Sequence, residues 1–337
     1  MLRPRGLDES ERCVKFHLLQ LIPWVAVAPR LARRRARAAA IALSGLVLAT
    51  ALSCGGNGGG ELAVLFYSDR DGDDDVYMMR MDGSGIEQIT DEPGRDYEAD
   101  ITPDGRTIVM ASQRASGSNA QLFLMDADGS NVRRLTFSTD GGRTVTDDYP
   151  HWSPDGRSVV FQRSTFEGQK VDADVWMIDA ATGEERQLTD TPDDWDSTPG
   201  FAPDGSAVLF ESNREGDFSI YRLDLETAEL TRLTDGERKA VGGKEAPRSR
   251  RLLFTSDADG DPEVFVQDAD GSNLRQLTDN DTRDQYPHWS PDGTSILFES
   301  SRDGNREIYV MNGAGSDQRR VTDDPGKDAD PHWVRHR

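Results

Sequence analysis

The sequence predicts an all-β fold, a six-bladed β-propeller built from four-stranded antiparallel blades. Three signals recur along residues 61–337 with a period of 44 to 53 residues. They are a Pro-Asp-Gly turn, an Ile, Leu or Val followed by Thr, and an Asp or Asn at the end of a strand. Four short strands in a repeat of that length are typical of a propeller blade. A helical solenoid is not favoured, because no apolar period of 3.6 residues accompanies the repeat.

The last full unit shows how each strand is assigned. Tyr286–Ser290 forms the first strand and leads into the Pro-Asp-Gly turn. Ser295–Glu299 forms the second strand, Glu307–Met311 the third and Arg319–Thr322 the fourth. Their β-branched and aromatic residues, bounded by Gly-containing turns, predict strands. Glycine in these tight turns supplies a positive φ without steric strain.

The same order of strands repeats six times. The second to fourth strands are expected within 62–90, 107–136, 158–189, 207–234, 251–278 and 295–322. Pro-Asp-Gly turns precede four of these segments, at 103–105, 154–156, 203–205 and 291–293. Pro247 marks the fifth turn, where Arg-Ser replaces Asp-Gly.

The two ends of the repeat region predict how the ring closes. The first unit begins with a second strand, Leu62–Phe66, and lacks a first strand. The chain ends with an unmatched first strand, Asp330–Val334. We therefore expect the C-terminal strand to complete the N-terminal blade, which removes the open edge of the sheet.

Residues 1–53 are expected to form an export signal. A cluster of arginines between Arg30 and Arg37 precedes an apolar run, Ala38–Ala51. This order of charge and apolar residues is typical of a secretory signal. The segment before Arg30 is long for such a signal and also fits a misassigned start codon.

Cys54 follows a small residue, and this arrangement resembles the lipobox of bacterial lipoproteins. The resemblance implies lipidation of Cys54, with residues 54–60 as a Gly-rich tether. We thus expect an exported protein, in the periplasm or on the extracytoplasmic membrane face, lipid-anchored through Cys54. An uncleaved membrane anchor is the alternative, although the apolar run is shorter than the roughly 20 residues of a spanning helix.

Charge is distributed unevenly along the chain. Residues 1–54 carry a net charge of +6, whereas the remaining 283 residues hold 30 basic and 58 acidic residues, a net of −28. An acidic surface repels phosphate backbones, so nucleic acid is not expected as a partner.

Two kinds of segment carry a family resemblance. Pro150–Gly156 and Pro287–Gly293 both read Pro-His-Trp-Ser-Pro-Asp-Gly, and Met125–Asn131 reads Met-Asp-Ala-Asp-Gly-Ser-Asn. These segments resemble the WD40-like repeats of the TolB propeller family, and the similarity covers residues 61–337. TolB itself has an additional α/β domain before its propeller, and we expect this chain to lack that domain.

Strand direction predicts which face of the ring binds a partner. Strands within a blade alternate in direction, so the loops after the second and fourth strands lie on one face. These loops vary in length, with the variable segments at 115–120, 137–147, 165–174, 191–196 and 235–243. Insertions confined to one face often mark the binding face of a repeat protein, although neutral drift of exposed loops is the alternative. We expect a monomer that binds an envelope protein or glycan.

Asp-rich loops suggest calcium at two places. One contains Asp69, Asp71 and Asp73, and the other contains Asp257, Asp259 and Asp261. Hard cations prefer several oxygen ligands. The alternative is ordinary turn chemistry, in which Asp side chains accept hydrogen bonds from their own backbone.

Histidines between Pro and Trp recur on the first strand of three units, as His151, His288 and His332. Asp100 holds the equivalent position in another unit, and Gly200 and Lys244 hold it in the remaining two. The four candidate ligands fall on successive blades, so they could bind a divalent metal near the channel. The related oligogalacturonate lyases use a channel metal held largely by histidine. Inheritance by duplication is the alternative explanation, and the adjacent Trp152, Trp289 and Trp333 are expected to be inter-blade core.

No nucleophile elbow, zinc-protease motif or phosphate loop occurs in the chain. The favoured function is therefore a non-enzymatic, exported propeller that binds a partner through its variable loop face, with no cofactor. The alternative is a metal-dependent lyase or hydrolase with a His-lined site near the channel.

Overall fold

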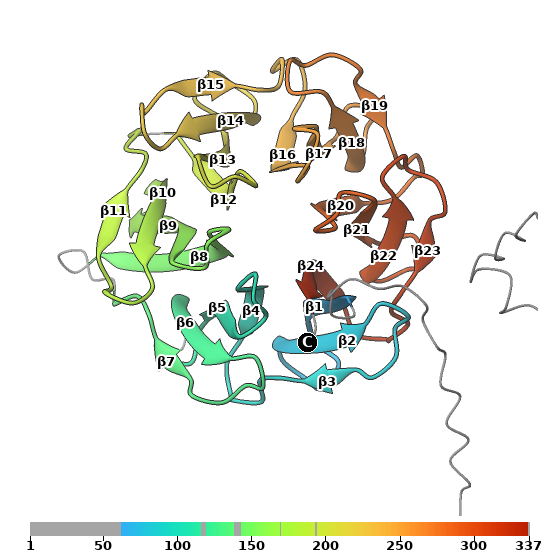
Figure 1. Ribbon diagram of the computed structural model, residues 1–337. Coiled ribbons are helices and arrows are strands. Elements are labelled where there is room, and N and C mark those ends of the chain that lie inside the picture. Colours follow the sequence, from blue (N-terminus) through green and yellow to red (C-terminus); the bar gives the residue numbers. More distant parts are fainter. Residues whose placement is uncertain (1–61, 116–118, 138–142, 169, 193, 336–337) are drawn as a thin grey trace, which may run out of the picture. The chain divides into compact units, whose positions relative to one another are not determined.

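A computed structural model describes residues 62–335 except 116–118, 138–142, 169 and 193. The expected signal region, Cys54 and the Gly-rich tether lie outside these residues. Twenty-four β-strands form six antiparallel sheets of four strands each, and these are the blades of a six-bladed β-propeller (Figure 1). The predicted fold class is confirmed. Among the described residues, no helix has the length and apolar character needed to cross a membrane.

Each blade runs from an innermost strand at the channel to a short outermost strand. From the channel outward, blade 1 contains β24 (Asp328–Arg335), β1 (Leu62–Ser68), β2 (Asp75–Arg80) and β3 (Glu87–Gln88). Blade 2 contains β4 (Asp96–Ile101), β5 (Thr107–Ser112), β6 (Gln121–Asp126) and β7 (Arg133–Arg134). Blade 3 contains β8 (Thr144–Trp152), β9 (Ser158–Glu167), β10 (Lys170–Asp179) and β11 (Glu185–Gln187).

The second half of the ring has the same plan. Blade 4 contains β12 (Asp196–Phe201), β13 (Ala207–Ser212), β14 (Ser219–Asp224) and β15 (Leu230–Arg232). Blade 5 contains β16 (Ala240–Glu245), β17 (Leu252–Ser256), β18 (Glu263–Gln267) and β19 (Arg275–Gln276). Blade 6 contains β20 (Asp284–Trp289), β21 (Ser295–Ser300), β22 (Glu307–Asn312) and β23 (Arg319–Arg320).

Ring closure follows the prediction. β24 pairs antiparallel with β1, and the register places Arg335 opposite Leu62 and Trp333 opposite Val64. The Trp333 indole donates a hydrogen bond of 3.0 Å to the carbonyl of His288 in blade 6. The C-terminal strand therefore completes blade 1 and also fastens it to its neighbour.

The hydrophobic core lies between the blades. Trp152, 7% exposed, packs in the cluster between blades 2 and 3, and Trp289, 8% exposed, packs in the cluster between blades 5 and 6. Trp333 is partly buried against the cluster between blades 6 and 1. All three predicted core tryptophans thus pack between blades, where large aromatic surfaces contribute strongly to stability.

Each innermost strand carries a β-bulge at the channel wall. In blades 1, 2, 3, 4 and 6 the bulge residue is not glycine and still has a φ between 49° and 53°: Asp330, Glu98, Tyr149, Thr198 and Tyr286. In blade 5 the residue is Gly242, with a φ of 64°. Such bulges re-aim neighbouring side chains and often occur beside functional sites.

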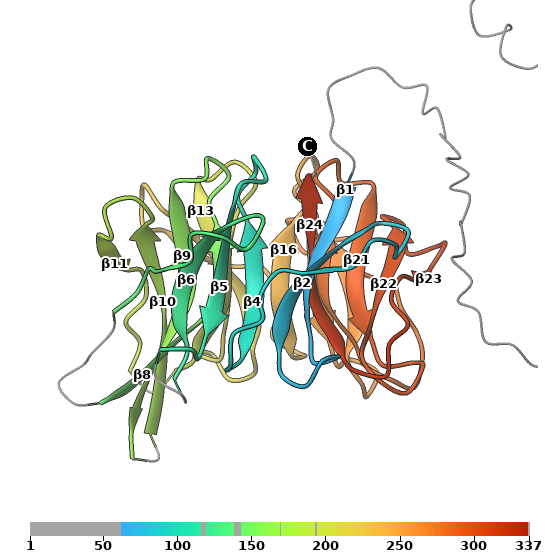
Figure 2. The same ribbon diagram turned by 90° about the horizontal axis from the view of Figure 1, so that it is seen from below.

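One segment predicted as a variable loop, 165–174, is largely strand, and another, 137–147, is strand from Thr144 onward. The expected loops 137–147 and 165–174 contain the start of β8, the end of β9 and the start of β10. The alternating sequence of 171–175, Val-Asp-Ala-Asp-Val, favours a strand, and Gly168 turns the chain with a φ of 65°. Together β9 and β10 make a long hairpin that projects from the ring (Figure 2).

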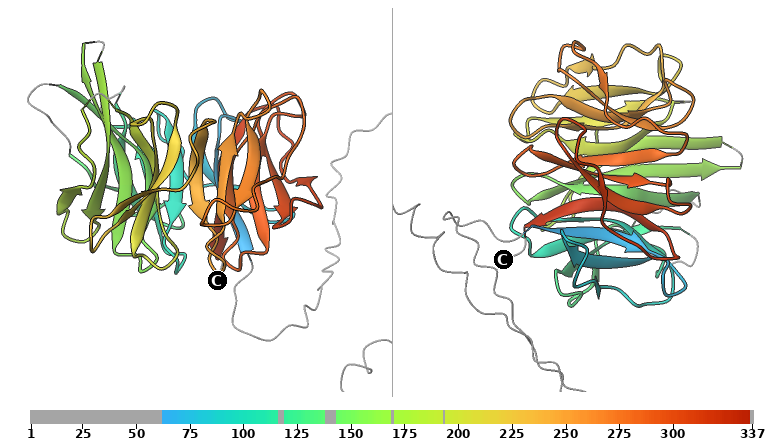
Figure 3. Two further views of the ribbon diagram at one scale, coloured as in Figure 1. Left: turned by 90° about the horizontal axis from the view of Figure 1, so that it is seen from above. Right: turned by 90° about the vertical axis from the view of Figure 1, so that its right-hand side faces the viewer.

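The hairpin projects from the face of the ring that carries the loops after the second and fourth strands. We call this face the loop face. The start of β1 and the end of β24 lie on the opposite face, as the side views show (Figure 3). The predicted separation of the two faces is therefore present in the propeller.

Candidate functional site in the central channel

Six residues occupy one repeated position on the innermost strands. Each is paired with the equivalent residue of the neighbouring second strand: Asp100 with Val109, His151 with Val160, Gly200 with Leu209, Lys244 with Leu253, His288 with Leu297 and His332 with Leu65. The repeat alignment expected from the sequence is thus correct at every blade. This common register directs the six positions toward the channel.

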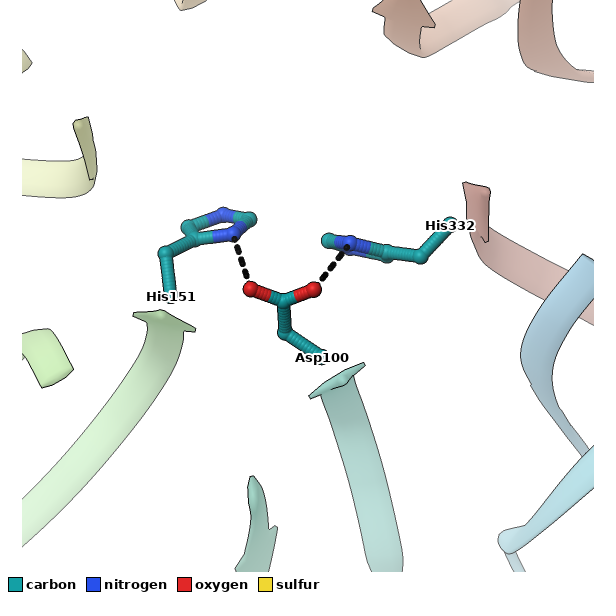
Figure 4. Close-up of side chains that lie close together, drawn as sticks. All are labelled: Asp100, His151 and His332. Carbon is teal, nitrogen blue, oxygen red and sulfur yellow. Dashed lines mark ion pairs between the residues drawn. The ribbon is translucent and has the colours of Figure 1, made fainter. Parts of the chain in front are cut away.

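The four predicted ligand residues converge there. The imidazole centroids of His288 and His332 lie 4.1 Å apart, and those of His151 and His332 lie 5.1 Å apart. The Asp100 carboxylate lies between two of these rings, 3.6 Å from Nδ1 of His151 and 3.4 Å from Nδ1 of His332 (Figure 4). The structure adds Asp330, whose Oδ1 is 3.5 Å from Nε2 of His332.

Asp100 is fixed by the backbone of two blades. Its Oδ1 accepts a hydrogen bond of 2.8 Å from the N–H of Ile101. Its Oδ2 accepts one of 2.8 Å from the N–H of Trp152, on the next blade. The carboxylate therefore holds its position between the imidazoles without depending on them.

Lys244 also reaches the cluster, and it does so by crossing a glycine. Its Nζ lies 2.9 Å from Nε2 of His151, two blades away. A Cβ placed on Gly200, on the blade between them, would lie 3.0 Å from that Nζ. Because Gly200 has no side chain, it leaves the space through which the Lys244 side chain reaches His151.

Burial and charge set the protonation of the cluster. Burial lowers the pKa of His332, but Asp330 and Asp100 outweigh it and raise the pKa to about 9. Burial and the Lys244 charge lower the pKa of His151 to about 4. Burial also holds the pKa of His288 well below its usual range. At neutral pH two imidazoles are thus neutral and one is cationic.

The lysine and the carboxylates complete this charge balance. Burial lowers the pKa of Lys244 to about 8, against the opposing effect of Asp330 and Asp100. Burial would raise the pKa of Asp100, but His151 and His332 hold it well below the usual value. Two carboxylates therefore face two cations, and buried charges of opposite sign stabilise one another in such a site.

The donor atoms suit a transition metal. Two groups of three offer ligand atoms within 4.8 Å of one another: Asp100, His151 and His332, and also His288, Asp330 and His332. Two imidazoles and one carboxylate are a common set for first-row metals. A metal that used His332 would have to replace the proton that this imidazole shares with the carboxylates.

A pocket on the loop face leads toward this cluster. It has a volume of about 200 Å³, and we call it the vestibule. Tyr149, Thr198, Gly242 and Tyr286 line both the vestibule and a small cavity beside the histidines. That cavity measures about 10 Å³, close to the space of one water molecule. Ligands can therefore approach the cluster from the loop face.

A family model described as the TolB beta propeller domain matches the chain at residues 26–166, 143–248 and 244–336. These matches cover most of the chain. The chain belongs to the TolB β-propeller domain family.

Sequence relatives of this TolB-like propeller match it over part of their length. An uncharacterized protein of Agrobacterium fabrum, Atu1656, is 34% identical over 106 residues, which is 30% of this chain and 36% of the relative. Four curated relatives, which include a TolB homolog and two peptidases, are matched over 20% to 36% of their own lengths. The chain thus spans a minor part of these proteins.

Solved structures share the fold at low identity. TolB from Acinetobacter baumannii is 20% identical with a TM-score of 0.68, covering 82% of this chain and 66% of that one. An oligogalacturonate lyase in complex with manganese is 16% identical with a TM-score of 0.54, covering 74% of this chain and 85% of that one. At such identities the likeness establishes the propeller fold alone.

The first Asp-rich loop of the TolB-like propeller makes contacts to neighbouring backbone. Asp69 accepts a hydrogen bond of 2.7 Å from the N–H of Lys327. Asp73 accepts one of 3.2 Å from the N–H of Gly94. These carboxylate oxygens join the loop to the segments that lead into two innermost strands, β24 of the same blade and β4 of the next blade.

Side-chain amides contact both Asp-rich loops. Asp71 accepts a hydrogen bond from the amide of Gln88, and Asp259 accepts one from the amide of Gln276. In the second loop the carbonyl of Asp257 accepts a hydrogen bond of 3.1 Å from the N–H of Gly260. Calcium at the two loops, including Asp257 and Asp261, stays a prediction.

The carboxylates that do approach one another in this region are Asp71, Asp75 and Asp91, within 4.8 Å. This set includes only one of the predicted calcium ligands.

Two channel residues of the TolB-like propeller are not among the metal ligands that the sequence predicts. Asp330 stands two positions before His332, where the bulge turns its side chain toward the same imidazole. Lys244 has the predicted slot, but its contact with His151 is an addition from the structure. The signal for both is the repeat register itself, which points to the bulge position as well as to the histidine position.

Proposed function

We propose that this TolB-like propeller is an exported, non-enzymatic protein that binds a protein partner in the cell envelope through its loop face. The observation that carries the proposal is the long β9–β10 hairpin, which extends one blade beyond the ring and is flanked by exposed aromatic side chains. A TolB homolog among the relatives supports the same kind of role.

The exposed aromatics differ in kind from the other exposed apolar residues. Phe137, Phe166 and Trp195 are 66%, 36% and 39% exposed, and all lie on segments beside or within the hairpin region. Trp195 forms a parallel bridge with Ala173 of β10, and Phe166 lies near the end of β9. The remaining exposed apolar side chains recur on or just before the outermost strands of other blades: Ile86, Val132, Leu230 and Leu274.

Repetition separates these two sets. A side chain that recurs at one slot in four blades is explained by the repeat, whereas three aromatics around one unrepeated hairpin need another explanation. Aromatic residues are enriched in protein interfaces because they bury a large area at low entropic cost.

A groove beside the hairpin adds mixed charge to this surface. It measures about 790 Å³ and is lined by Phe137, Arg143, Trp176 and Asp172, among others. Arg163 also lines the groove and forms ion pairs of 2.7 Å with Asp147 and 2.6 Å with Glu185. A rim of both signs suits recognition of a protein surface, where charge complementarity sets specificity.

Paired substitutions test this surface. Phe166→Ser with Trp195→Ser removes two of the aromatics, and Ile86→Ser with Leu274→Ser is the matched control at similar exposure. We expect the first variant to lose partner capture from envelope extract by at least about tenfold, since interface aromatics often contribute about 2 kcal/mol or more. Equal capture by both variants, or loss only in the control, would contradict the assignment of the binding surface.

We also propose that the protein is lipid-anchored through Cys54, which lies outside the described residues. The lipobox-like sequence and the family membership support an extracytoplasmic location. Because lipidation joins the diacylglycerol to sulfur, Cys54→Ser should release the protein from membranes or leave it unprocessed. A lipid-labelled membrane pool that is unchanged in this variant would contradict the anchor.

A second candidate function is metal-dependent chemistry in the channel. The convergence of three imidazoles and two carboxylates favours it, and a manganese-bound lyase shares the propeller fold. Metal analysis after dialysis against Mn²⁺ or Zn²⁺ tests it. His288→Ala should reduce uptake, and Lys244→Met should increase it by freeing Nε2 of His151. No stoichiometric metal in either the wild type or Lys244→Met would exclude this candidate.

A further inference from the structure

We propose that the vestibule over blade 5 is a binding site for a carboxylate, which fills a position that the chain's own glutamates occupy in the neighbouring blades. The site goes beyond the proposed partner binding, because the hairpin surface belongs to blade 3 whereas the vestibule lies over blade 5.

The position is defined by strand register. On the second strand of blade 4, Glu211 is paired with Ser197. The equivalent residue of blade 6, Glu299, is paired with Gln285. In blade 5 the same slot holds Thr255, which is paired with Val241. Two blades thus place a carboxylate where the blade between them places a hydroxyl.

In blade 4 that carboxylate bridges to the next blade. Oε2 of Glu211 accepts a hydrogen bond of 2.8 Å from the N–H of Gly242, the bulge residue of blade 5. Its Oε1 accepts one of 2.8 Å from the hydroxyl of Ser197. Glu299 likewise interacts with the backbone of Asp330, the bulge residue of blade 1. A carboxylate in this slot therefore accepts a hydrogen bond from the backbone N–H of the bulge residue in the following blade.

Blade 5 does not supply this carboxylate. Thr255 occupies the position that the glutamates hold in blades 4 and 6, and the bulge residue of the following blade, blade 6, is Tyr286. Both residues line the vestibule. Thr255 is only 3% exposed, and within the described residues its Oγ1 has no hydrogen-bond partner. A buried hydroxyl without a partner carries an uncompensated desolvation cost, which a ligand oxygen can relieve.

Two cations stand at the mouth of the vestibule. Lys239 and Arg283 line it, and both are exposed. In the described part of the chain, Lys239 lies 5.7 Å from the Phe218 ring, and neither cation forms an ion pair with a carboxylate. Of the acids that line the pocket, Glu211 is already bonded to Gly242 and Ser197, and Asp257 is exposed at the rim.

These features select the charge and the size of the ligand. In a chain with a net charge of −22, two cations without acidic partners mark a local preference for an anion. A volume of about 200 Å³ is below the roughly 300–1,000 Å³ of typical drug-sized pockets. The ligand is therefore a small carboxylic acid or the carboxylate end of a longer chain.

Titration with small acids tests the site. Acetate and succinate are added to the ¹⁵N-labelled protein, with acetamide and succinamide as neutral isosteres, and the backbone amide of Tyr286 is followed by NMR. We expect saturable shifts with the acids only. A dipeptide with a free C-terminus, compared with its C-terminal amide, distinguishes a chain end from a free acid as the natural source.

Three variants sharpen the result. Thr255→Glu should supply the missing carboxylate from the protein itself, as Glu211 does, and abolish acid binding while the fold is retained. Arg283→Gln should weaken binding at least about fivefold, and Arg186→Gln on blade 3, also exposed, should leave it unchanged.

Equal shifts with acids and amides, or acid binding that survives in Thr255→Glu, would overturn the proposal. These outcomes do not depend on partner capture, so failure here and failure of the hairpin surface are separate results.

Discussion

Arg250 shows how one residue can carry backbone strain in an otherwise regular repeat. In four blades the glycine of the Pro-Asp-Gly turn adopts a φ of 69° to 73°: Gly105, Gly156, Gly205 and Gly293. Blade 5 has Ser249 in that place, and Arg250 takes the left-handed conformation instead, with a φ of 51°. The left-handed region costs an L-residue roughly 1–2 kcal/mol.

Arg250→Gly should therefore raise the free energy of unfolding by about 1 kcal/mol, because glycine adopts this φ without strain. The control is Arg248→Gly, an exposed neighbour whose φ is not positive, where added chain entropy should lower stability slightly. Urea denaturation of both variants measures the difference. Equal loss of stability in both would mean that Arg250 carries no relievable strain.

Glu263 is a buried acid whose blade does not provide a cation. Burial raises its pKa to about 7. The equivalent acid in blade 6, Glu307, is bonded at 2.6 Å to Arg320, whereas blade 5 has Gln276 in the place of that arginine. Desolvation of the Glu263 carboxylate is therefore poorly compensated, as it also is for the equivalent Asp75 and Asp174, which face glutamines as well.

This raised pKa predicts a dependence of stability on pH. The folded pKa of about 7 exceeds the ordinary value of 4.5, so the stabilising contribution is present below about pH 4.5 and is lost as pH rises through about 7. Glu263→Gln should remove this loss, so that the variant gains stability relative to wild type between about pH 5 and pH 8. Glu307→Gln, which breaks an ion pair, should be less stable at both values. Parallel pH profiles for wild type and Glu263→Gln would refute the assignment.

At the scale of elements, one Arg–Asp pair ties the innermost strand of a blade to the loop after its second strand or, in blade 3, to the second strand itself. It recurs in five blades: Arg70–Asp328, Arg114–Asp96, Arg163–Asp147, Arg214–Asp196 and Arg302–Asp284. In each pair the aspartate side chain is fully buried. Blade 5 lacks both partners, with Ala240 and Ala258 in their places.

There is a physical reason why blade 5 lacks both the arginine and the aspartate and not only one of them. Removal of one partner leaves a buried charge unpaired, which typically costs about 3–5 kcal/mol, whereas removal of both is often tolerated. Blade 5 accordingly packs Ala240 and Ala258 against its apolar cluster.

A double-mutant cycle in blade 4 tests this coupling. Arg214→Ala should cost about 3–5 kcal/mol by leaving Asp196 unpaired, and the double variant Arg214→Ala with Asp196→Ala should cost less than the single one. Thermal or urea unfolding of the four proteins gives the coupling energy. Additive losses would show that the pair does not act as a unit.

At the scale of the whole molecule, stability depends on the closed ring. Truncation after Asp328 removes nearly all of β24, exposes the edge of β1 and deletes the contacts of Trp333. We expect a loss of at least about 3–5 kcal/mol, the range of a buried aromatic truncation. A truncated protein that melts at the wild-type temperature would show that closure by β24 is unnecessary.

Much of this architecture can be predicted from the sequence because the same turn and strand signals recur in successive blades. The period, the Pro-Asp-Gly turns and the unmatched Asp330–Val334 segment predict the blade number and the closing strand. The repeated slot also predicts that Asp100, His151, His288 and His332 lie on successive blades, and the channel brings them together.

The features that the repeat does not predict lie at positions where one blade differs from the others. The sequence predicts loops in place of the β9–β10 hairpin because an insertion has no counterpart in other units to align with. The reach of Lys244 to His151 depends on the path of a flexible side chain over Gly200, which sequence spacing does not specify. The vestibule depends in the same way on the length difference between threonine and glutamate at one slot.

The pairing of Leu62 with Arg335 also determines how the propeller responds to mechanical force. Pulling these two residues apart would open β1 and β24 one hydrogen bond at a time, as in unzipping. Pulling Leu62 along its own strand, while a partner holds the loop face, would instead load the hydrogen bonds of β1 to both β24 and β2 together. Because β24 makes β1 an inner strand with two neighbours, a molecule held at its first strand and bound at its opposite face carries tension in shear, the direction in which a sheet resists best.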